Sequence, residues 1–174
     1  TPHWGDVNTL AAECFVKSED ARIKIISATL SGPFCAMAHT LPARYPLHAN
    51  GEKMPQTFMG LLPDPCFWEP GSPFTYQLEL EICKEGASTL RDSLIVGIRP
   101  LSIRGPDLYY ADRRYVMRMV DLPRGVENAG SEEDVLARCL DSGSVLLLRH
   151  PAPSILARAT QQGVLLAVEL DSTD

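Results

Sequence analysis

The sequence predicts a mainly β protein with an α/β part: an antiparallel β-sandwich followed by a hairpin and a truncated β-α-β-α-β unit. Two observations predict it. Apolar and polar residues alternate strictly along residues 74–82, as in a strand with one buried face. After about residue 120 the pattern changes to helices and strands that are apolar on both faces, which is typical of a parallel sheet. We therefore expect two domains, at residues 1–104 and 105–174.

Strand-like segments divided by turn-forming residues make up the first part. They are residues 10–16, 22–30, 56–62, 74–82 and 89–103. This spacing favours an antiparallel sandwich. Residues 39–55 are expected to form one long loop. Residues 105–120 are expected to form a hairpin with Asp112 and Arg113 at its turn, between two arms rich in aromatic and β-branched residues.

Helices and strands alternate in the last part of the chain. Residues 131–143 predict a helix with Ser131 as its N-cap and Gly143 as its stop, and residues 153–163 predict a second helix ending at Gly163. Two-sided apolar strands follow the helices, at residues 144–150 and 164–170. With residues 116–120 as the first strand, right-handed crossovers place three parallel strands side by side.

Composition excludes several classes of function. The net charge of −6, with the Lys and Arg residues scattered singly, supplies no surface for nucleic acid. No apolar run approaches the roughly 20 residues that span a bilayer, and residues 1–10 do not resemble a signal peptide, so we expect a soluble chain. The start at Thr1 leaves open whether a leader was removed.

Cysteine and histidine usage gives no metal or disulfide pattern. Five irregularly spaced cysteines are interpreted as free, buried thiols, which favours a cytoplasmic location. The four histidines are too dispersed to suggest a zinc site, and the chain has no phosphate-binding loop. We expect no metal and no cofactor.

Residues 63–73 are unusually rich in proline just before the alternating strand. Pro63, Pro65, Pro70 and Pro73 surround Phe67 and Trp68. Proline fixes φ without requiring ladder hydrogen bonds, so this stiff segment is interpreted as a crossover at the edge of the sandwich. Trp68 is then expected to be a buried anchor rather than a platform on which a sugar stacks.

An ordered set of residues carries a resemblance to a known family. The set is Trp68, Pro70, Pro73, Phe74, Tyr76 and Leu78, then Gly97, Ile98 and Arg99, then "LYYADRRYVMRMV" at residues 108–120, then the helix and strand pattern of residues 131–170. This order resembles the middle of a glycoside hydrolase family 2 enzyme, the group of β-galactosidases, β-glucuronidases and β-mannosidases. The resemblance implies an immunoglobulin-like sandwich followed by the start of an (α/β) barrel.

The resemblance also implies where the chemistry would lie. A retaining glycosidase needs two carboxyl groups about 5 to 5.5 Å apart. The family carries them at the ends of its fourth and seventh barrel strands, and the chain as given stops after the third, so we expect no catalytic residue in it. Sugar-contacting side chains are expected at the ends of the first three barrel strands. They are Asp121, Arg149, His150 and Glu169, and the alternative for His150 is a solvated turn residue before Pro151.

These expectations lead to a non-catalytic scaffold or interaction protein of glycoside hydrolase family 2 type. Two alternatives stay open, namely a fragment of a larger retaining β-glycosidase and a carbohydrate-binding module that uses the sandwich face. The expected partners are a carbohydrate, and a second copy or another protein that covers the apolar edge at residues 164–170.

Overall fold

The computed structural model describes residues 2–7, 11–18, 22–50, 57–84, 89–121 and 132–169, and the chain divides into two compact units. The sandwich unit comprises residues 1–67 and 74–98, and the α/β unit comprises residues 68–73 and 99–174. The division after residue 104 that the sequence suggests stays a prediction. The compact units instead change over after Ile98, and they assign the proline-rich residues 68–73 to the α/β unit.

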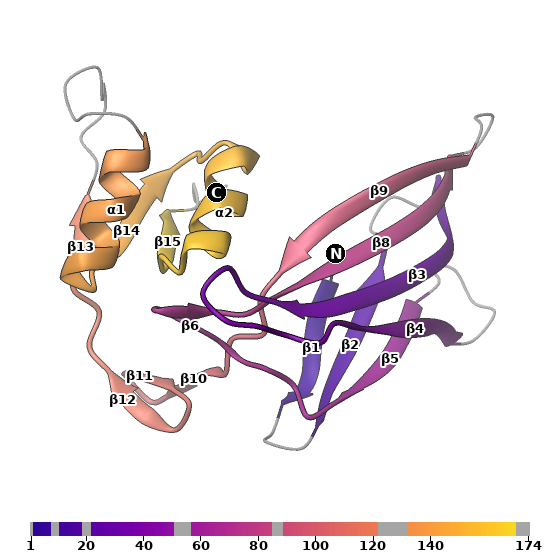
Figure 1. The fold of residues 1–174 in the computed structure, drawn as a ribbon, viewed down its shortest axis with the longest axis horizontal. Helices are drawn as coiled ribbons and strands as arrows, with labels where there is room; N and C mark the ends of the chain where they lie inside the picture. Colours follow the sequence, from indigo (N-terminus) through magenta and orange to yellow (C-terminus); the bar gives the residue numbers. More distant parts are fainter. Residues whose placement is uncertain are drawn as a thin grey trace. The chain divides into compact units, whose positions relative to one another are not determined.

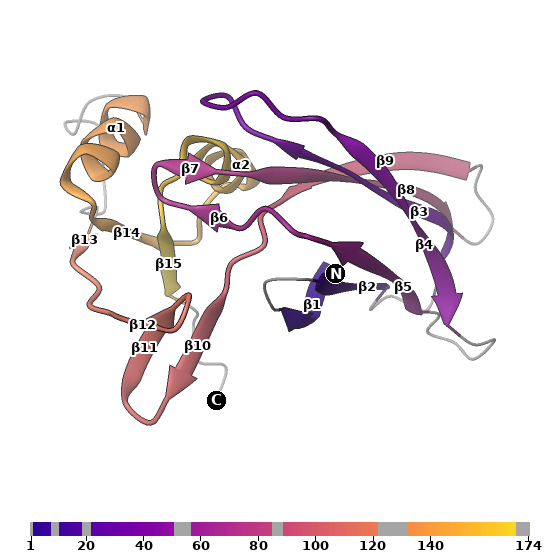
Figure 2. The ribbon, with the colours of Figure 1, turned by 60° about the horizontal axis from the view of Figure 1, so that its bottom comes forward.

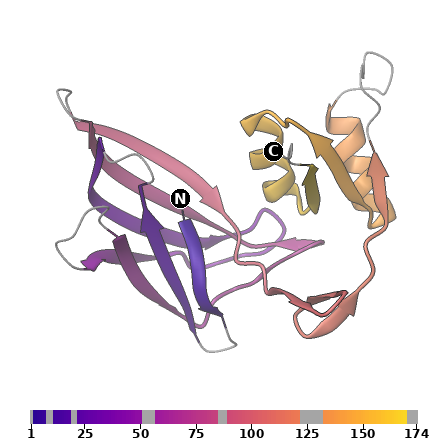
Figure 3. The same cartoon turned by 180° about the vertical axis from the view of Figure 1, so that it is seen from behind.

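Seven antiparallel strands form one curled sheet in the sandwich unit, in the order β1-β2-β5-β4-β3-β8-β9 (Figure 1). Their bounds are β1 Pro2–Val7, β2 Ala11–Lys17, β3 Ile23–Phe34, β4 Ala43–Asn50, β5 Thr57–Pro63, β8 Thr75–Lys84 and β9 Thr89–Val96. Figure 3 turns the molecule so that the indigo N-terminal strands come to the front, and the sheet is seen to curl over itself. The predicted antiparallel sandwich is confirmed.

The core of the sandwich unit lies inside the curl. Alternate residues of every inner strand point into it, as the two-residue period of a strand requires. Its buried members are Ala12, Cys14, Val16, Ile25, Ala28, Leu30, Leu47, Phe58, Leu62, Tyr76, Leu78 and Ile98. On β8 the alternation seen in the sequence is confirmed at Tyr76 and Leu78, which are buried, and at Glu79, which is exposed. Thr75, on the polar side of the pattern, is buried as well.

The five cysteines carry thiols rather than disulfides, as expected, but only two of them are buried. Cys14 lies in the sandwich core and Cys139 in the α/β core, whereas Cys35, Cys66 and Cys83 are half-buried. Burial raises the pKa of the Cys14 thiol to about 12, so this side chain behaves as a small hydrophobe rather than as a nucleophile.

Residues 39–55 do not form one long loop, because β4 occupies residues 43–50. β4 pairs with β3 over its first half and with β5 over its last three residues, so it joins the two layers of the curl. Pro46 lies opposite Thr29 of β3, in the part of β4 whose other edge has no paired strand. A proline is tolerated in such a position because its missing N–H would face no ladder partner.

Two other segments differ from the sequence-based expectation. β1 was not predicted, and it is recognised only by its pairing with β2, which is interrupted by a register shift between Trp4 and Val7. The segment 89–103 is divided between β9 and a separate strand in the α/β unit, because the chain leaves the sheet after Val96. Long-range pairing, which a local pattern does not contain, decides both cases.

A close approach between β4 and β5 leads to the first prediction. A Cβ added to Gly60 would lie 2.3 Å from Cδ2 of Leu47 and 3.3 Å from the carbonyl oxygen of Pro46. Because Leu47 is buried in the core, Gly60→Ala is expected to lower the free energy of unfolding by about 1 to 3 kcal/mol. Urea unfolding followed by circular dichroism measures it.

The matched control lies next to it on the same strand. Leu61 is 61% exposed, so Leu61→Ala is expected to change the free energy of unfolding by less than about 0.5 kcal/mol. Equal stability of Gly60→Ala and the unmodified chain would show that β4 does not pack on β5 as described.

The α/β unit begins with a short hairpin and a three-stranded antiparallel meander (Figure 2). The hairpin consists of β6 Trp68–Glu69 and β7 Ser72–Pro73, and the meander of β10 Leu101–Arg104, β11 Asp107–Tyr110 and β12 Arg113–Tyr115. The predicted turn at Asp112 and Arg113 lies one residue earlier, at Ala111 and Asp112, whose φ angles are 47° and 62°. Two successive residues with positive φ fit a type I′ hairpin turn.

Three parallel strands with two crossover helices follow the meander, as predicted. They are β13 Met119–Asp121, α1 Glu132–Ser142, β14 Val145–Arg149, α2 Pro153–Gln162 and β15 Leu166–Glu169, with strand order β13-β14-β15. Pro153 stands in the first turn of α2, and Gly163 ends it with φ 85° in the left-handed region. The predicted N-cap Ser131 lies outside the described residues.

Both helices cover the same face of the parallel sheet, as Figure 2 shows. The core between them contains Val135, Leu136, Cys139, Leu146, Leu148, Ile155, Ala159 and Val164. An ion pair between Glu132 and Arg158 joins the two helices. Neither α1 nor α2, the helices in the described part of the chain, has the length and apolarity that crossing a membrane requires.

Trp68 anchors the β6–β7 hairpin to the end of α2. Its side chain is fully buried, and its indole N–H donates a hydrogen bond of 2.6 Å to the carbonyl oxygen of Thr160. The Arg99 guanidinium lies 4.1 Å from the indole ring centroid and donates to the Thr160 hydroxyl at 3.1 Å. The expected burial of Trp68 is confirmed, but it anchors a hairpin of the α/β unit rather than a crossover at the sandwich edge. It satisfies a carbonyl in the last turn of the helix.

The anchor leads to the second prediction. Trp68→Phe removes the indole donor and leaves both a cavity and an unpaired carbonyl, so the free energy of unfolding is expected to fall by about 2 to 4 kcal/mol. Thr160→Val keeps the backbone carbonyl and removes only the acceptor of Arg99, so a loss of about 1 kcal/mol is expected. Urea unfolding of the full chain measures the free energy of unfolding of both variants. If Trp68→Phe lowers it no more than Thr160→Val does, Trp68 does not anchor the hairpin.

Candidate functional site at the parallel strand ends

The strand register brings three of the four predicted site residues together. Arg149 lies opposite Glu169 in the pairing of β14 with β15, and Asp121 lies opposite Leu147 in the pairing of β13 with β14. Residues directly opposite each other share a face, and so do residues two apart in a strand. Asp121, Arg149 and Glu169 therefore lie on one face, opposite the face of Leu146 and Leu148, which pack against the helices.

Arg149 is the centre of this cluster. Its Nε donates to a carboxylate oxygen of Glu169, and its Nη2 lies 4.0 Å from Oδ2 of Asp121. The three side chains are 40%, 51% and 54% exposed for Arg149, Glu169 and Asp121. The cluster is thus open to solvent at the carboxyl ends of the strands, and it links all three strands through one guanidinium.

The electrostatics of the cluster are those of a solvent-exposed ion pair. The hydrogen bond that Arg149 donates to Glu169, followed by the charges of Glu169 and Asp121, raises the pKa of Arg149 from an already high value. When the pKa of an arginine is higher in the folded chain than in the unfolded chain, the ion pair adds stability at every pH below the unfolded-state pKa. This stability is lost only as the pH rises through the folded-state pKa. Arg149 is therefore charged at every physiological pH, and salt rather than pH controls the strength of the cluster.

His150 follows Arg149 with a φ of 50°, in the left-handed region, and its residue is exposed. The strand ends with this turn, and Pro151 and α2 follow. The structure therefore places His150 beside the cluster in the sequence but not on the ladder that aligns the other three residues. Its predicted contact with a sugar stays a prediction.

The two carboxylates of the cluster have similar surroundings. A retaining glycosidase separates its two carboxyl groups into an acid that holds a proton and a nucleophile that is ionised, and their different surroundings set these roles. Asp121 and Glu169 instead face the same guanidinium and have similar exposure. This arrangement can orient strand ends and offer oxygen acceptors to hydroxyl groups.

The depressions elsewhere on the described surface include two with polar linings. One, of about 550 Å³, lies on the outer face of the curled sheet and is lined by polar side chains, among which Arg44 pairs with Glu79 at 3.0 Å and Arg91 with Glu81 at 3.9 Å. The other, of about 680 Å³, lies in the α/β unit between the meander and the β6–β7 turn. Among the described residues no three His, Cys, Asp or Glu side chains are grouped to hold a metal.

Sequence reasoning missed the second depression entirely. Glu69, Tyr110, Arg113 and Tyr115 line it, and they come from two segments more than forty residues apart. The only local signal is the alternation of aromatic and basic residues in "YYADRRY" at residues 109–115. That pattern reads as a hairpin, and it does not show which face of the hairpin meets another element.

Comparison with known proteins identifies the fold. No protein-family model matches the sequence, and no curated protein is significantly similar to it. Three solved structures each cover 95% of the chain: a β-glycosidase from Bacteroides vulgatus (TM-score 0.61, 14% identity), a β-glucuronidase from Parabacteroides merdae (TM-score 0.60, 18% identity), and a glycosyl hydrolase family 2 member from Bacteroides cellulosilyticus (TM-score 0.61, 14% identity).

The likeness covers a small share of those proteins. This chain spans 22%, 23% and 23% of the β-glycosidase, the β-glucuronidase and the family 2 member, respectively. At such low identity the comparison shows the fold alone: an antiparallel sandwich followed by parallel strands and helices, as in part of the glycoside hydrolase family 2 structures. The resemblance stated from the sequence is supported at this level.

The third prediction concerns the Arg149 cluster. Arg149→Gln removes the charge that joins three strand ends, so the melting temperature is expected to fall by about 1 to 3 °C at low salt. The difference from the unmodified chain is expected to shrink in about 1 M NaCl, where the Debye length falls to roughly 3 Å. Differential scanning calorimetry at both salt concentrations measures it.

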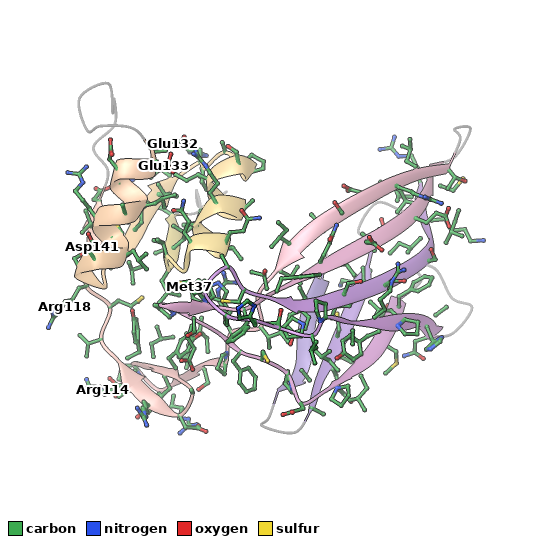
Figure 4. The ribbon with its side chains drawn as sticks, viewed as in Figure 1. Met37, Arg114, Arg118, Glu132, Glu133 and Asp141 are labelled. Carbon is green, nitrogen blue, oxygen red and sulfur yellow. The ribbon has the colours of Figure 1, made fainter. Side chains whose placement is uncertain are left out.

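The control for this prediction is Arg118, an exposed arginine of the same unit whose side chain points outward in Figure 4. Arg118→Gln is expected to leave the melting temperature and its salt dependence unchanged, because its guanidinium has no ion pair among the described residues. A salt dependence that Arg149→Gln does not reduce would contradict the role of the cluster as an inter-strand link.

Proposed function

We propose that this chain is a scaffold of glycoside hydrolase family 2 type that carries no catalytic carboxyl pair of its own. The observation that carries the proposal is the Arg149 cluster on the strand-end face. The two carboxylates at this face, Asp121 and Glu169, pair with one guanidinium and so link three parallel strands. Residues engaged in this way support the strand ends and offer acceptors to a sugar, but they do not form an acid and a nucleophile.

The fold supports the same proposal. A curled antiparallel sheet and a parallel α/β unit follow one another in the chain, each with its own buried core. Domains of this kind position groups for binding, and the fold by itself does not define a reaction. The chain is thus proposed to contribute shape and stability, and the sugar-contacting role of Asp121, Arg149, His150 and Glu169 belongs to this proposal.

The edge of β15 is proposed as the place where this scaffold associates. Among the described residues β15 pairs only with β14, and Val168 at its centre is 41% exposed. An unpaired strand with exposed apolar side chains is a template for another strand. A further strand of a longer chain, a second copy or another protein would satisfy it.

A second candidate function is supported by the small share of the similar solved structures that this chain covers. The chain spans 19–27% of the solved family 2 structures to which it is similar. In this candidate the chain is the sandwich and barrel-start segment of a longer retaining β-glycosidase, and the continuation supplies the two carboxyl groups. The β15 edge is then covered by the next barrel strand.

The fourth prediction separates these candidates by activity. The purified chain is expected to release no nitrophenol above the buffer rate from p-nitrophenyl β-galactoside, β-glucuronide or β-mannoside, because its described strand-end carboxylates share one arginine. The same assay is applied to the product of the reading frame continued past Asp174. Hydrolysis with retained anomeric configuration by the longer product alone would establish the second candidate.

The control variants of this assay are Glu169→Gln and Asp121→Asn. If the chain as given hydrolyses a substrate and either substitution abolishes this hydrolysis, the scaffold proposal is wrong. If neither substitution changes the hydrolysis, the activity comes from a contaminating glycosidase. Gel filtration confirms this origin when the activity elutes in different fractions from the chain.

A further inference from the structure

The meander places aromatic and basic side chains together on one face. In the pairing of β11 with β12, Tyr110 lies opposite Arg113 and Leu108 lies opposite Tyr115. Because residues opposite each other or two apart share a face, Tyr110, Arg113 and Tyr115 lie on the same side. The two tyrosine rings are 6.2 Å apart between centroids and tilted by 49°. They form an apolar wall with polar tips.

This face lines a groove opposite the turn of the β6–β7 hairpin. The groove has a volume of about 680 Å³. It is lined by Glu69, Pro70, Tyr110, Ala111, Arg113, Arg114 and Tyr115. All of these residues belong to the α/β unit. The Trp68 anchor holds the hairpin in place, so the groove has one fixed wall from the hairpin and one from the meander.

Two polar groups of the groove lack partners in the described part of the chain. The Tyr110 hydroxyl is covered and has no hydrogen-bond partner there. Arg113 is exposed and has no ion pair there, whereas the adjacent Arg114, which also lines the groove, pairs with Asp107 at 2.8 Å. Of these two groups, the exposed Arg113 is the one that a ligand in the groove can reach.

The charges of the groove define the ligand. Arg113, which has no ion pair in the described part of the chain, donates hydrogen bonds, and the Glu69 carboxylate accepts them. Arg114 also lines the groove, but its charge is already paired with Asp107. An anionic ligand would face Glu69, and a cationic ligand would face Arg113. A neutral ligand with several hydroxyl groups suits both, because each hydroxyl can donate to the carboxylate and accept from the guanidinium. The tyrosine faces suit the C–H surface of a sugar ring.

We propose that the groove bounded by Glu69, Tyr110, Arg113 and Tyr115 is a binding site for a neutral saccharide. A pyranose ring lies against the tyrosine wall, while Arg113 and Glu69 bind its hydroxyl groups. The groove is formed by different residues from the strand-end cluster of Asp121, Arg149 and Glu169. It therefore adds a binding activity that does not depend on the scaffold proposal.

The experiment is a titration of the ¹⁵N-labelled full chain with the neutral disaccharides cellobiose and lactose, followed by NMR. The expected result is saturable shifts at residues 69 and 108–115 for at least one of them, with a dissociation constant in the millimolar range, about 1 mM. Tyr115→Leu and Arg113→Gln are each expected to weaken binding about fivefold or more. Dispersion of the NMR spectrum verifies that each variant is folded.

Matched controls distinguish the groove from the rest of the meander. Tyr109 neighbours Tyr110 in sequence but lies on the opposite face, where it pairs with Arg114, so Tyr109→Leu is expected to leave the affinity unchanged. Arg118→Gln is the corresponding control for Arg113→Gln. Glucuronate tests the charge argument, and weaker binding of glucuronate than of the neutral sugars is expected.

Several results would overturn the proposal. They are the absence of saturable shifts with both disaccharides, a loss of affinity in Tyr109→Leu equal to that in Tyr115→Leu, and tighter binding of glucuronate or acetate than of the neutral sugars. The hydrolysis assay tests the scaffold proposal with different residues and a different signal. A failure of either proposal is therefore distinguishable from a failure of the other.

Discussion

The α/β unit depends on one buried tryptophan. The Trp68 indole donates to the backbone of α2 at Thr160, and Arg99 stacks on the ring and binds the Thr160 hydroxyl. Three segments that are far apart in the sequence meet at this point. Gly163 permits the close approach, since a Cβ there would lie 3.3 Å from the backbone nitrogen of Gly71. Without this anchor the β6–β7 hairpin would have no fixed place in the unit.

A comparable constraint closes the sandwich unit. β4 pairs with β3 along one half and with β5 along the other, so a single strand connects the two layers and makes one continuous curled sheet. Pro46 is compatible with this change of partner because its edge is unpaired at that point. The core inside the curl then contains side chains from both layers, which is the sandwich arrangement in physical terms.

The two candidate sites illustrate what fixes the position of a functional group. In the strand-end cluster, residues from three strands share one face because the parallel register aligns them. The ends of these strands could be located from the sequence. Asp121, Arg149 and Glu169 were therefore predictable as neighbours. Their pairing through one guanidinium was not, because it depends on side-chain geometry. The groove was not predictable at all, since Glu69 reaches it only through the anchored hairpin.

The sequence by itself determined the elements whose signal is local. The alternation of β8, the breaks at Gly143 and Gly163, and the two-sided apolar strands β14 and β15 follow from period and propensity, which neighbouring residues express directly. Only the tertiary structure decided the rest. β1 and β4 became strands because distant strands pair with them, and the hairpin at residues 68–73 joined the α/β unit because Trp68 found its partners in α2 and Arg99. Such pairings join residues far apart in the chain, and no local pattern contains them.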